Sequence, residues 1–511
     1  MRARPAVLAA ATAALLLLVG CSGGDEAPEP AASGPNAPSV SAPAVPDALS
    51  TYYDQKLSWT DCGDGYQCSK LTVPVDYADP SGATIPLSVI KLPAGKPKQR
   101  LGSLVVNPGG PGASGVDYAR RASTSISAAT RRAYDVVGFD PRGVATSDPL
   151  ECLTDAQTDT FIGQDPTPDT PAEVSRMTAI GKGMGLGCQR ADPALVGHVD
   201  TVSAARDMDV LRAALGDKRL FYLGKSYGTY LGATYADLFP TNIGRMVLDG
   251  AIDPRLSARE IDLGQAKGFE QATRAFVADC VDRSGCPLGS DVGRGMQRIQ
   301  GLLASLDAKP LPSGDPSRPL TEGWGSYGIA LGMYDKGFWP SLREALDQAF
   351  SRDGRGLMQL ADMYADRQPD GTYAGNGTPA LYAVNCLDRP VGDGAADVKA
   401  ELPTFQRAAP TWGGLLAWGE LPCTSWPLPA TGKPHAVTAP GSPPIVVVGT
   451  TRDPATPYPW AQGLAEQLSD GHLITYRGDG HTAYMRGSRC VDKAVDAYLL
   501  RGTKPKDGLT C

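Results

Sequence analysis

The sequence has no excess of basic residues. Its 511 residues include 48 Lys and Arg against 55 Asp and Glu, which gives a formal charge of −7 and a pI near 5.3. Nucleic-acid binding needs a basic face to meet the phosphates, so this balance argues against nucleic acid as the main partner. Disorder throughout is also excluded, because 42% of the residues are hydrophobic and can build a sizeable core.

Aromatic residues are sparse as well, at 7%, and the chain has only four histidines. The low aromatic content gives no support to a groove for lipid chains. There is no CxxC pair, and no His stands at metal-ligand spacing from two cysteines, so the sequence does not predict a zinc site. We expect no bound metal and no cofactor, and the few histidines narrow the search for a catalytic base.

Beyond its N-terminus the sequence has no hydrophobic run of about 20 residues, the length that a membrane-spanning helix needs. At the N-terminus, Arg2 and Arg4 precede an uncharged stretch from Pro5 to Val19, which fits a signal peptide. The stretch ends in Leu-Val-Gly before Cys21, and this pattern resembles the lipobox of bacterial lipoproteins. The resemblance implies cleavage before Cys21 and attachment of a diacylglycerol, with acyl chains such as palmitate, to its thiol.

We therefore interpret residues 1–20 as a lipoprotein signal peptide and residues 21–50, rich in Ala, Pro and Ser, as an extended tether. The expected location is extracytoplasmic, with the protein anchored by lipid to the bacterial cell membrane or released from it. The N-terminal anchor is then its only contact with the membrane. A plain signal peptide followed by an unrelated cysteine is the alternative.

The ten cysteines after Cys21 are an even number, as expected for disulfides formed outside the cytoplasm. The sequence alone does not fix how they pair. Pairing between nearest neighbours is the most economical choice, because the cysteines fall into five local couples separated by longer gaps. These couples are Cys62–Cys68, Cys152–Cys188, Cys280–Cys286, Cys386–Cys423 and Cys490–Cys511.

Short runs rich in β-branched residues, each bounded by turn signals, predict the strands of a sheet. Several are apolar almost throughout, which is typical of parallel strands covered on both faces. Helical segments lie between them, such as the one from Thr201 to Leu215 with Asp200 or Thr201 as its cap. This alternation predicts an α/β fold with a mostly parallel, doubly wound sheet. The predicted strands are Leu71–Val75, Ser103–Asn107, Asp135–Asp140, Arg219–Leu223, Arg245–Asp249, Pro444–Gly449 and Leu473–Tyr476.

The pattern becomes helical between residues 255 and 435. Apolar residues spaced by three and four occur in Gln265–Asp279, Val292–Leu306 and Phe338–Phe350, and strand signals return only at Pro444. A sheet interrupted by a long helical insertion is a core with a cap. We expect the core in residues 51–254, a mainly helical cap in 255–435, and the rest of the core in 436–511.

A candidate nucleophile follows the predicted strand Arg219–Leu223. Ser226 lies in Gly224-Lys225-Ser226-Tyr227-Gly228, and an apolar helix to Phe239 comes directly after it. Gly-x-Ser-x-Gly at a strand-to-helix turn exposes the serine in a strained backbone conformation, and side chains at the two glycine positions would crowd that turn. The pattern alone arises easily by chance, so its place between a strand and a helix carries the prediction.

A serine nucleophile needs a base and an acid that orients the base. His481 lies in a glycine-bounded loop just after the strand Leu473–Tyr476, and Asp453 comes immediately after the preceding strand. The order Ser226, Asp453, His481 is that of α/β-hydrolases and differs from the order in chymotrypsin and subtilisin. Asp249, at the end of its own strand, is the second candidate for the acid.

The oxyanion of a tetrahedral intermediate needs amide donors held in place. One should be the amide of Tyr227, the residue after the nucleophile. The glycine-rich segment Asn107–Gly112 after the strand Ser103–Asn107 should supply the other, from Gly110 or Gly109. A merely tight turn is the alternative interpretation of this segment.

Together these motifs resemble the proline iminopeptidases and tripeptidyl aminopeptidases, serine peptidases of the α/β-hydrolase fold. The resemblance covers about residues 57–511 and is weakest in the cap; Asn-Pro stands where proline iminopeptidases have a histidine in the oxyanion motif. It places Thr456 near the triad as a supporting residue. The motifs are Asn107–Gly112, Asp140-Pro141-Arg142-Gly143, Asp207-x-Asp209-x-x-Arg212, Gly224–Gly228, Val247–Gly250, Asp453-x-x-Thr456-Pro457 and Gly480-His481.

The resemblance implies a secreted serine exopeptidase that acts on peptides or proteins and releases short peptides from free N-termini. Such enzymes hold the substrate ammonium with an acidic group, and Asp388 and Glu322 are candidates without a firm assignment. The same triad also fits a carboxylesterase or lipase acting on acyl esters. A non-enzymatic solute-binding lipoprotein needs neither the serine turn nor the ordered Asp and His, and is the remote alternative.

Overall fold

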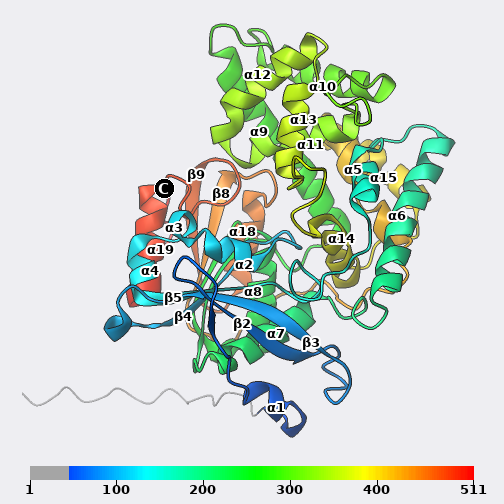
Figure 1. The fold of residues 1–511 in the computed structure, drawn as a ribbon. Helices are drawn as coiled ribbons and strands as arrows, with labels where there is room; N and C mark the ends of the chain where they lie inside the picture. Colours follow the sequence, from blue (N-terminus) through cyan, green and yellow to red (C-terminus); the bar gives the residue numbers. More distant parts are fainter. Residues whose placement is uncertain (1–44) are drawn as a thin grey trace, which may run out of the picture. The chain divides into compact units, whose positions relative to one another are not determined.

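A nine-stranded sheet organises the computed structural model, which describes residues 45–511. Strands β4 to β9 run parallel to one another, whereas β1, β2 and β3 pair antiparallel at one edge (Figure 1). The predicted strand Leu71–Val75 is part of this antiparallel edge. In spatial order the strands are β1 (Thr60–Asp61), β2 (Gln67–Pro74), β3 (Thr84–Leu92), β5 (Tyr134–Phe139), β4 (Gly102–Asn107), β6 (Leu220–Lys225), β7 (Ile243–Asp249), β8 (Ile445–Arg452) and β9 (Gly471–Asp479).

Both faces of the sheet are buried, as the continuous apolar runs predict. In β4, Leu104 and Val106 face one core, and Val105 faces the other. One face is covered by α2 (Gly115–Arg120), α3 (Ala122–Ser125), α4 (Ala128–Ala133) and α19 (Arg489–Arg501). The other is covered by α7 (Thr201–Ala214), α8 (Tyr227–Leu238) and α18 (Tyr458–Gln467), with α1 (Ser50–Tyr53) beside α7. This is the doubly wound arrangement of the α/β-hydrolase fold.

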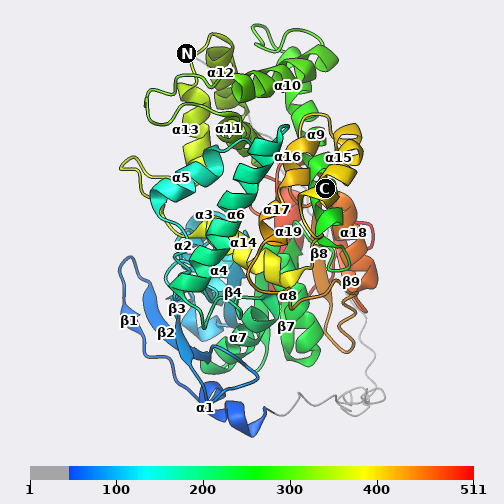
Figure 2. The same ribbon diagram turned by 90° about the vertical axis from the view of Figure 1, so that its right-hand side faces the viewer.

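A second group of helices lies between β7 and β8 in the sequence and beyond one end of the sheet (Figure 1). Two helices from before β6, α5 (Asp155–Gly163) and α6 (Pro171–Ala191), pack against it through α11, α14 and α17 (Figure 2). The group comprises α9 (Ala258–Val281), α10 (Val292–Ala308), α11 (Glu322–Tyr334), α12 (Trp339–Phe350), α13 (Arg355–Tyr364), α14 (Gly377–Asp388), α15 (Ala395–Ala408), α16 (Gly413–Trp418) and α17 (Leu421–Thr424). We refer to these nine helices as the cap helices.

The expected elements and the observed ones differ at a few places. Strand β3 was not among the expected strands, although Ile85, Leu87 and Val89 alternate with more exposed residues along its first half. The expected boundaries at 254/255 and 435/436 lie in the loops before α9 and after α17. Residues 1–20, most of the tether and the predicted anchor Cys21 lie outside the described residues.

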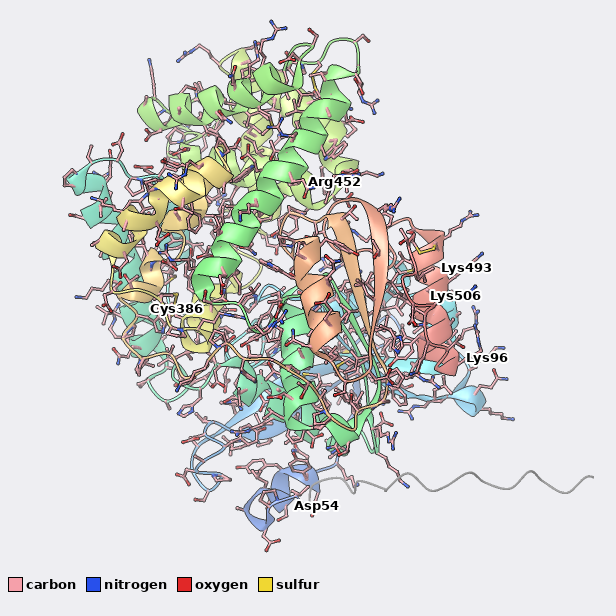
Figure 3. All side chains as sticks on the ribbon, turned by 180° about the vertical axis from the view of Figure 1, so that it is seen from behind. Asp54, Lys96, Cys386, Arg452, Lys493 and Lys506 are labelled. Carbon is pink, nitrogen blue, oxygen red and sulfur yellow. A yellow bond between two sulfur atoms is a disulfide. The ribbon has the colours of Figure 1, made fainter. Side chains whose placement is uncertain are left out.

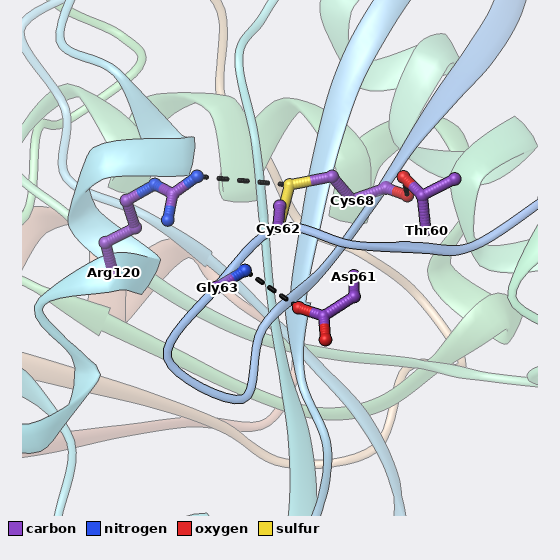
Figure 4. The surroundings of a disulfide bond; sticks show 6 residues. All are labelled: Thr60, Asp61, Cys62, Gly63, Cys68 and Arg120. Atoms are coloured by element: carbon purple, nitrogen blue, oxygen red, sulfur yellow. Dashed lines mark hydrogen bonds between the residues drawn. A yellow bond between two sulfur atoms is a disulfide. The ribbon is translucent and has the colours of Figure 1, made fainter.

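The structure contains five disulfides, and they join the same neighbouring pairs that the sequence suggested. Figure 4 shows Cys62–Cys68 closing the turn between β1 and β2, where the Gly63 amide donates to Asp61 Oδ1 at 2.8 Å. Cys386 lies on α14 (Figure 3) and joins that helix to Cys423 on α17. Disulfides therefore hold several connections within the cap helices and the core.

The C-terminal segment lies along the outer edge of the sheet. The Thr475 amide in β9 donates to Leu509 O at 2.9 Å, and the Cys511 amide donates back to Thr475 O at 2.7 Å. A disulfide fastens Cys511 to Cys490 at the start of α19. In the described part of the chain we find no helix with the length and apolar character needed to cross a membrane.

Candidate active site

Ser226 stands at the turn between β6 and α8, in a backbone conformation that non-glycine residues rarely adopt. Its φ and ψ are 56° and −127°. The neighbouring glycines leave room for this turn: a Cβ on Gly224 would lie 2.2 Å from Gly228 O, and one on Gly228 would lie 2.8 Å from Asn107 O. The strained turn therefore depends on both glycines and presents the Ser226 side chain at the N-terminus of α8.

Asp453 and His481 follow the adjacent parallel strands β8 and β9, which brings them to the same end of the sheet. His481 Nδ1 lies 2.8 Å from Asp453 Oδ1 and 3.0 Å from Oδ2. The buried carboxylate also accepts the amides of Ala455, Thr456 and Thr482, at 3.0, 2.9 and 3.1 Å. These bonds fix the carboxylate, which in turn orients the imidazole ring.

The second nitrogen of the imidazole makes no hydrogen bond to a described residue. Among residues 45–511, no hydrogen-bond partner reaches the buried His481 Nε2 atom. Thr456 Oγ1 lies 3.4 Å from Nδ1, so Thr456 contacts the His–Asp pair where the family resemblance placed it. With Nδ1 on Asp453, Nε2 is the atom left to take a proton from a serine.

Gly250 is the point where the serine turn and the histidine loop meet. A Cβ on Gly250 would lie 3.4 Å from His481 Cε1 and 2.9 Å from Thr482 Cγ2. The preceding residue, Asp249, accepts the Ser226 amide through its backbone carbonyl at 3.0 Å. The structure thus brings Ser226, Asp453 and His481, predicted from three distant parts of the sequence, to one site.

The glycine-rich segment after β4 lies directly against the serine. A Cβ on Gly109 would lie 2.8 Å from Ser226 Cβ and 2.9 Å from the Tyr227 nitrogen. The Gly109 amide donates to Asn107 Oδ1 at 2.9 Å, whereas the Gly110 and Tyr227 amides have no acceptor within the described residues. Of the two glycines, Gly110 is therefore the one whose amide remains free to act with Tyr227 as an oxyanion donor.

The Tyr227 side chain is held by a buried network behind the serine. Its hydroxyl lies 2.5 Å from Thr201 Oγ1, which donates to Asp388 Oδ2 at 2.6 Å. Asp388 Oδ1 accepts the Thr201 amide at 2.8 Å, and burial raises the pKa of Asp388 to about 6. Both Asp388 oxygens are thus used inside the protein, so this candidate for binding a substrate ammonium supports the start of α7 and the Tyr227 ring instead.

Glu322, the other candidate, begins α11 at the end away from the site. Its carboxylate accepts Thr167 Oγ1 at 2.7 Å, and burial raises its pKa to about 7. Oxygens of Asp165, Asp307 and Glu322 lie within 4.8 Å of one another beside a cavity of about 200 Å³. Since α11 has 13 residues and a helix rises about 1.5 Å per residue, Glu322 is about 18 Å along the axis from Tyr334, the α11 residue that contacts His481.

The other three histidines, and Asp479 two residues before His481, have other partners. Asp479 pairs with Arg452, whose Nη2 lies 2.9 Å from Oδ2. His435 and His472 each contact a nearby aspartate, at 3.1 and 2.8 Å, and His198 is 4.0 Å from Asp76. Asp249 faces the loop after His481 rather than the imidazole. The geometry therefore favours His481 and Asp453 over every alternative that the sequence offered.

The cap helices place aromatic rings next to His481, which sequence reasoning did not identify. The Tyr334 ring of α11 lies edge-on to His481 with centroids 5.2 Å apart, and Tyr364 of α13 lies 5.3 Å from Tyr334. Tyr327 continues the row at 5.2 Å from Tyr364, and α14 contributes Tyr382. Tyr327 and Tyr334 both lie on α11, but Tyr364 and Tyr382 come from two other helices, so no local sequence pattern connects all four.

Asp262 on α9 was also missed. The half-buried carboxylate has no hydrogen bond or ion pair within the part of the chain that the structure describes. Burial raises its pKa well above the ordinary value; the charge of Glu420 acts in the same direction, and those of Arg259 and Arg389 oppose it. A half-buried carboxylate with a raised pKa and no hydrogen-bond partner makes Asp262 a candidate binding residue. Its position in an amphipathic helix gave no sequence signal.

The sheet topology, the strained serine turn and the Asp–His pair define a serine hydrolase of the α/β-hydrolase class. Residues 409–511 match the family described as TAP-like protein. Serine protease Hip1 of Mycobacterium tuberculosis is 38% identical over 480 residues, covering 89% of this chain and 91% of that protein.

Two further relatives have different names. Tripeptidyl aminopeptidase of Streptomyces lividans is 32% identical over 472 residues, covering 89% of this chain and 86% of that protein. Carboxylesterase B of Mycobacterium tuberculosis is 39% identical over 454 residues, covering 87% and 86%. The chain belongs to the serine peptidase family that contains serine protease Hip1 and the tripeptidyl aminopeptidases.

Proposed function

We propose that this protein is a serine exopeptidase that releases short peptides, of about three residues, from free N-termini. The observation that carries the proposal is the His481–Asp453 pair facing the strained Ser226 turn, beside two amides without acceptors. Relatives named serine protease and tripeptidyl aminopeptidase support the same assignment. Peptides or proteins with an accessible N-terminus are the proposed substrates.

Each group has a defined part in the reaction. Ser226 Oγ attacks the scissile carbonyl while His481 Nε2 accepts its proton, and Asp453 stabilises the imidazolium through Nδ1. The amides of Tyr227 and Gly110 bind the oxyanion, and the N-terminus of α8 adds a favourable field. His481 then gives the proton to the leaving amine. Water, activated by the same imidazole, hydrolyses the acyl-enzyme and restores Ser226.

Asp262 is the group we assign to the substrate ammonium. It lies seven residues before Phe269 on α9, and the Phe269 ring is 5.8 Å from the ring of Tyr334, which contacts His481. Seven helical residues rise about 10 Å, and three extended peptide residues also span about 10 Å. A tripeptide held by its ammonium on Asp262 would thus reach about as far along α9 as Phe269, which contacts the Tyr334 ring beside His481. The cation would also supply the positive partner that this carboxylate lacks.

The test compares chromogenic Ala-Ala-Pro amides with free and acetylated N-termini, together with a simple acyl ester. The wild type should strongly prefer the free amine. Asp262→Asn should lower kcat/KM for the free amine by about 10- to 100-fold, and leave the ester nearly unchanged, because an ion pair is lost. Asp279→Asn, at the other end of α9, is the matched control. Equal cleavage of free and acetylated amides by the wild type would exclude the aminopeptidase assignment.

A carboxylesterase acting on acyl esters is the second candidate, and the relative named carboxylesterase B favours it. The triad serves both reactions, so the ester in the same experiment decides between them. A high kcat/KM for the ester with negligible amide cleavage would support the esterase. Labelling by a fluorophosphonate that persists in Ser226→Ala would exclude Ser226 as the nucleophile, whereas no labelling of the wild type would favour a binding lipoprotein.

We also propose that the protein is exported and anchored to the bacterial cell membrane by lipid on Cys21. The support is the sequence before this cysteine, with its basic start, apolar stretch and Leu-Val-Gly. Cys21→Ala should move the protein from the membrane fraction to the medium or keep it in its uncleaved form. Wild type that carries no acyl group on Cys21 in mass spectrometry would refute the anchor.

A further inference from the structure

Two buried charged residues next to the triad have no part in the reaction described above. Lys225 directly precedes Ser226, and only 7% of its surface is exposed. Asp249, at the end of the neighbouring strand β7, is fully buried. Lysine and aspartate are almost never fully buried unless they are paired, so their presence between two central strands calls for a physical explanation.

Lys225 reaches across the site to the loop that carries the histidine. Its Nζ donates to the Tyr484 carbonyl at 2.6 Å and lies 3.6 Å from Asp249 Oδ2. The ammonium also lies 5.9 Å from the centre of the Tyr484 ring. A side chain attached next to the nucleophile thus ends on the residue three places after His481.

Asp249 contacts both parts of the site at once. Its backbone carbonyl accepts the Ser226 amide at 3.0 Å. Its carboxylate accepts the Ala483 amide at 2.9 Å and the Tyr484 amide at 3.0 Å. The serine turn and the histidine loop are therefore joined through one residue, and Lys225 provides the positive charge beside its carboxylate.

The histidine loop needs such support because its backbone is strained. Thr482 and Met485 have φ values of 65° and 60°, in the left-handed region that side chains disfavour. The amides of this loop are held mainly by carboxylates: Thr482 by Asp453 and Met485 by Asp492, in addition to the two held by Asp249. Without these acceptors the loop would relax to an ordinary backbone conformation and carry His481 with it.

We propose that Lys225 and Asp249 are positioning residues, which hold loop 481–485 against the serine turn so that His481 Nε2 faces Ser226 Oγ. The inference rests on the proposed serine hydrolase function but on neither peptide nor ester as the substrate. The proposal gives Lys225, the second residue of the Gly-x-Ser-x-Gly motif, a role that the motif does not require, since any residue can stand at that position. It also explains why Asp249, once a candidate for the triad acid, lies so near His481.

Because Lys225 and Asp249 are charged, their positioning role should affect how the activity depends on pH. Burial raises the pKa of Asp249, and Lys225, the two loop amides and His481 oppose that effect. Burial also raises the pKa of Asp492 on α19, and the Met485 amide and the Lys225 charge oppose that effect. Removing the ammonium should raise the pKa of Asp249 further. A protonated Asp249 accepts the loop amides less well, so activity should then fail at a higher pH than in the wild type.

The experiment measures kcat, KM and the pH profile on a simple acyl ester, the rate of fluorophosphonate labelling, and thermal unfolding. Lys225→Met should lower kcat and the labelling rate by about 10- to 100-fold with KM nearly unchanged, because a misplaced base costs about that much. The acid limb of the pH–rate profile of this variant should move to higher pH by roughly one unit. Lys493→Met, an exposed lysine on α19 (Figure 3), is the matched control and should change none of these values.

The double variant Lys225→Met/Asp249→Asn removes both charges and guards against a folding defect. Its kcat should remain low, because the contacts of Lys225 and Asp249 with loop 481–485 are still missing. The acid limb of its pH–rate profile should return to the wild-type position, since position 249 no longer carries a group that titrates. Variants that unfold at lower temperature yet keep the wild-type kcat and acid limb would overturn the proposal. If the fluorophosphonate does not label the wild type at all, the underlying hydrolase assignment would be refuted instead.

Discussion

At the residue scale, glycine decides how closely the oxyanion segment approaches the nucleophile. Gly109 has φ 99°, and the space around its missing side chain is filled by the serine turn. The sequence predicted the segment but left Gly109 and Gly110 as equal donors. The hydrogen bond from the Gly109 amide to Asn107 distinguishes the two glycines, because it leaves only the Gly110 amide free. No sequence pattern contains that information, since it depends on how the segment turns after β4.

Gly109→Ala should therefore damage catalysis far more than folding. The added Cβ would lie 2.6 Å from Lys225 O and 2.8 Å from Ser226 Cβ, which pushes the donors away from the oxyanion. We expect kcat to fall about 100-fold or more, as when an oxyanion donor is removed. Gly289→Ala shares the positive φ but has no neighbour within 4 Å of the new Cβ, and serves as the control. Equal effects of both substitutions on kcat would contradict this role.

Glu322 makes the stability of the protein depend on pH. Burial raises its pKa to about 7 in the folded state, above the ordinary value of 4.5 that applies when the chain is unfolded. The folded state thus binds the additional proton between these values, and the free energy of unfolding falls as the pH rises through 7. Glu322→Gln should be more stable than the wild type at pH 8, by up to about 3 kcal/mol, and equal to it near pH 4.

Urea unfolding at both pH values measures this difference. Glu344→Gln, at an exposed position on α12, is the control and should behave like the wild type at each pH. A Glu322→Gln variant that gains no stability at pH 8 would show that the Glu322 carboxyl ionises normally in the folded protein.

At the scale of elements, two cap helices contact the candidate active site. The Tyr334 carbonyl at the end of α11 accepts the His481 amide at 2.9 Å. On α9, a Cβ at Gly268 would lie 3.0 Å from the Asp453 carbonyl. The helical character of this region was readable from spacings of three and four, and α10 and α12 begin within a residue of the predicted starts. The docking of α9 and α11 on the triad loops was not readable, because it joins residues far apart in sequence.

Gly480→Ala tests the contact between α11 and the histidine loop. Its φ is 99°, and the new Cβ would lie 2.9 Å from Tyr334 O, so the loop and the helix end must separate. We expect kcat to fall by about 10-fold or more from displacement of the base. Gly487→Ala has nearly the same φ, 98°, and nothing within 4 Å of its Cβ. If the two variants lose activity equally, backbone strain alone would explain the loss.

At the scale of the whole molecule, the sequence predicted the mostly parallel sheet well and placed Asp453 and His481 after neighbouring strands. Parallel strands buried on both faces leave continuous apolar runs, and functional residues follow the ends of such strands. The antiparallel strand β3 was missed because it alternates and contains Pro86. The contact between Tyr334 and Tyr364 and the burial of Asp262 were missed because they depend on how separate helices pack, which no single segment records.

The disulfides should contribute unequally to stability, because their loops differ in length. Cys152–Cys188 and Cys386–Cys423 span 36 and 37 residues, whereas Cys62–Cys68 and Cys280–Cys286 span only 6. Loop-closure entropy gives about 4 kcal/mol for each long loop and about 2 kcal/mol for each short one. Replacing each pair by alanines and measuring urea unfolding should show the long pairs to be the costlier losses. The reverse order would refute an entropic origin.

The segment that ends at Cys511 also protects the sheet from other chains. Strand β9 would otherwise present unpaired amides and carbonyls, which form a template for edge-to-edge association. The bonds between Thr475 and residues 509 and 511 occupy part of that template, and the opposite edge strand, β1, is only two residues long. Deleting residues 503–511 would reopen the β9 edge, and the predicted cost is aggregation during refolding rather than a change in the active site.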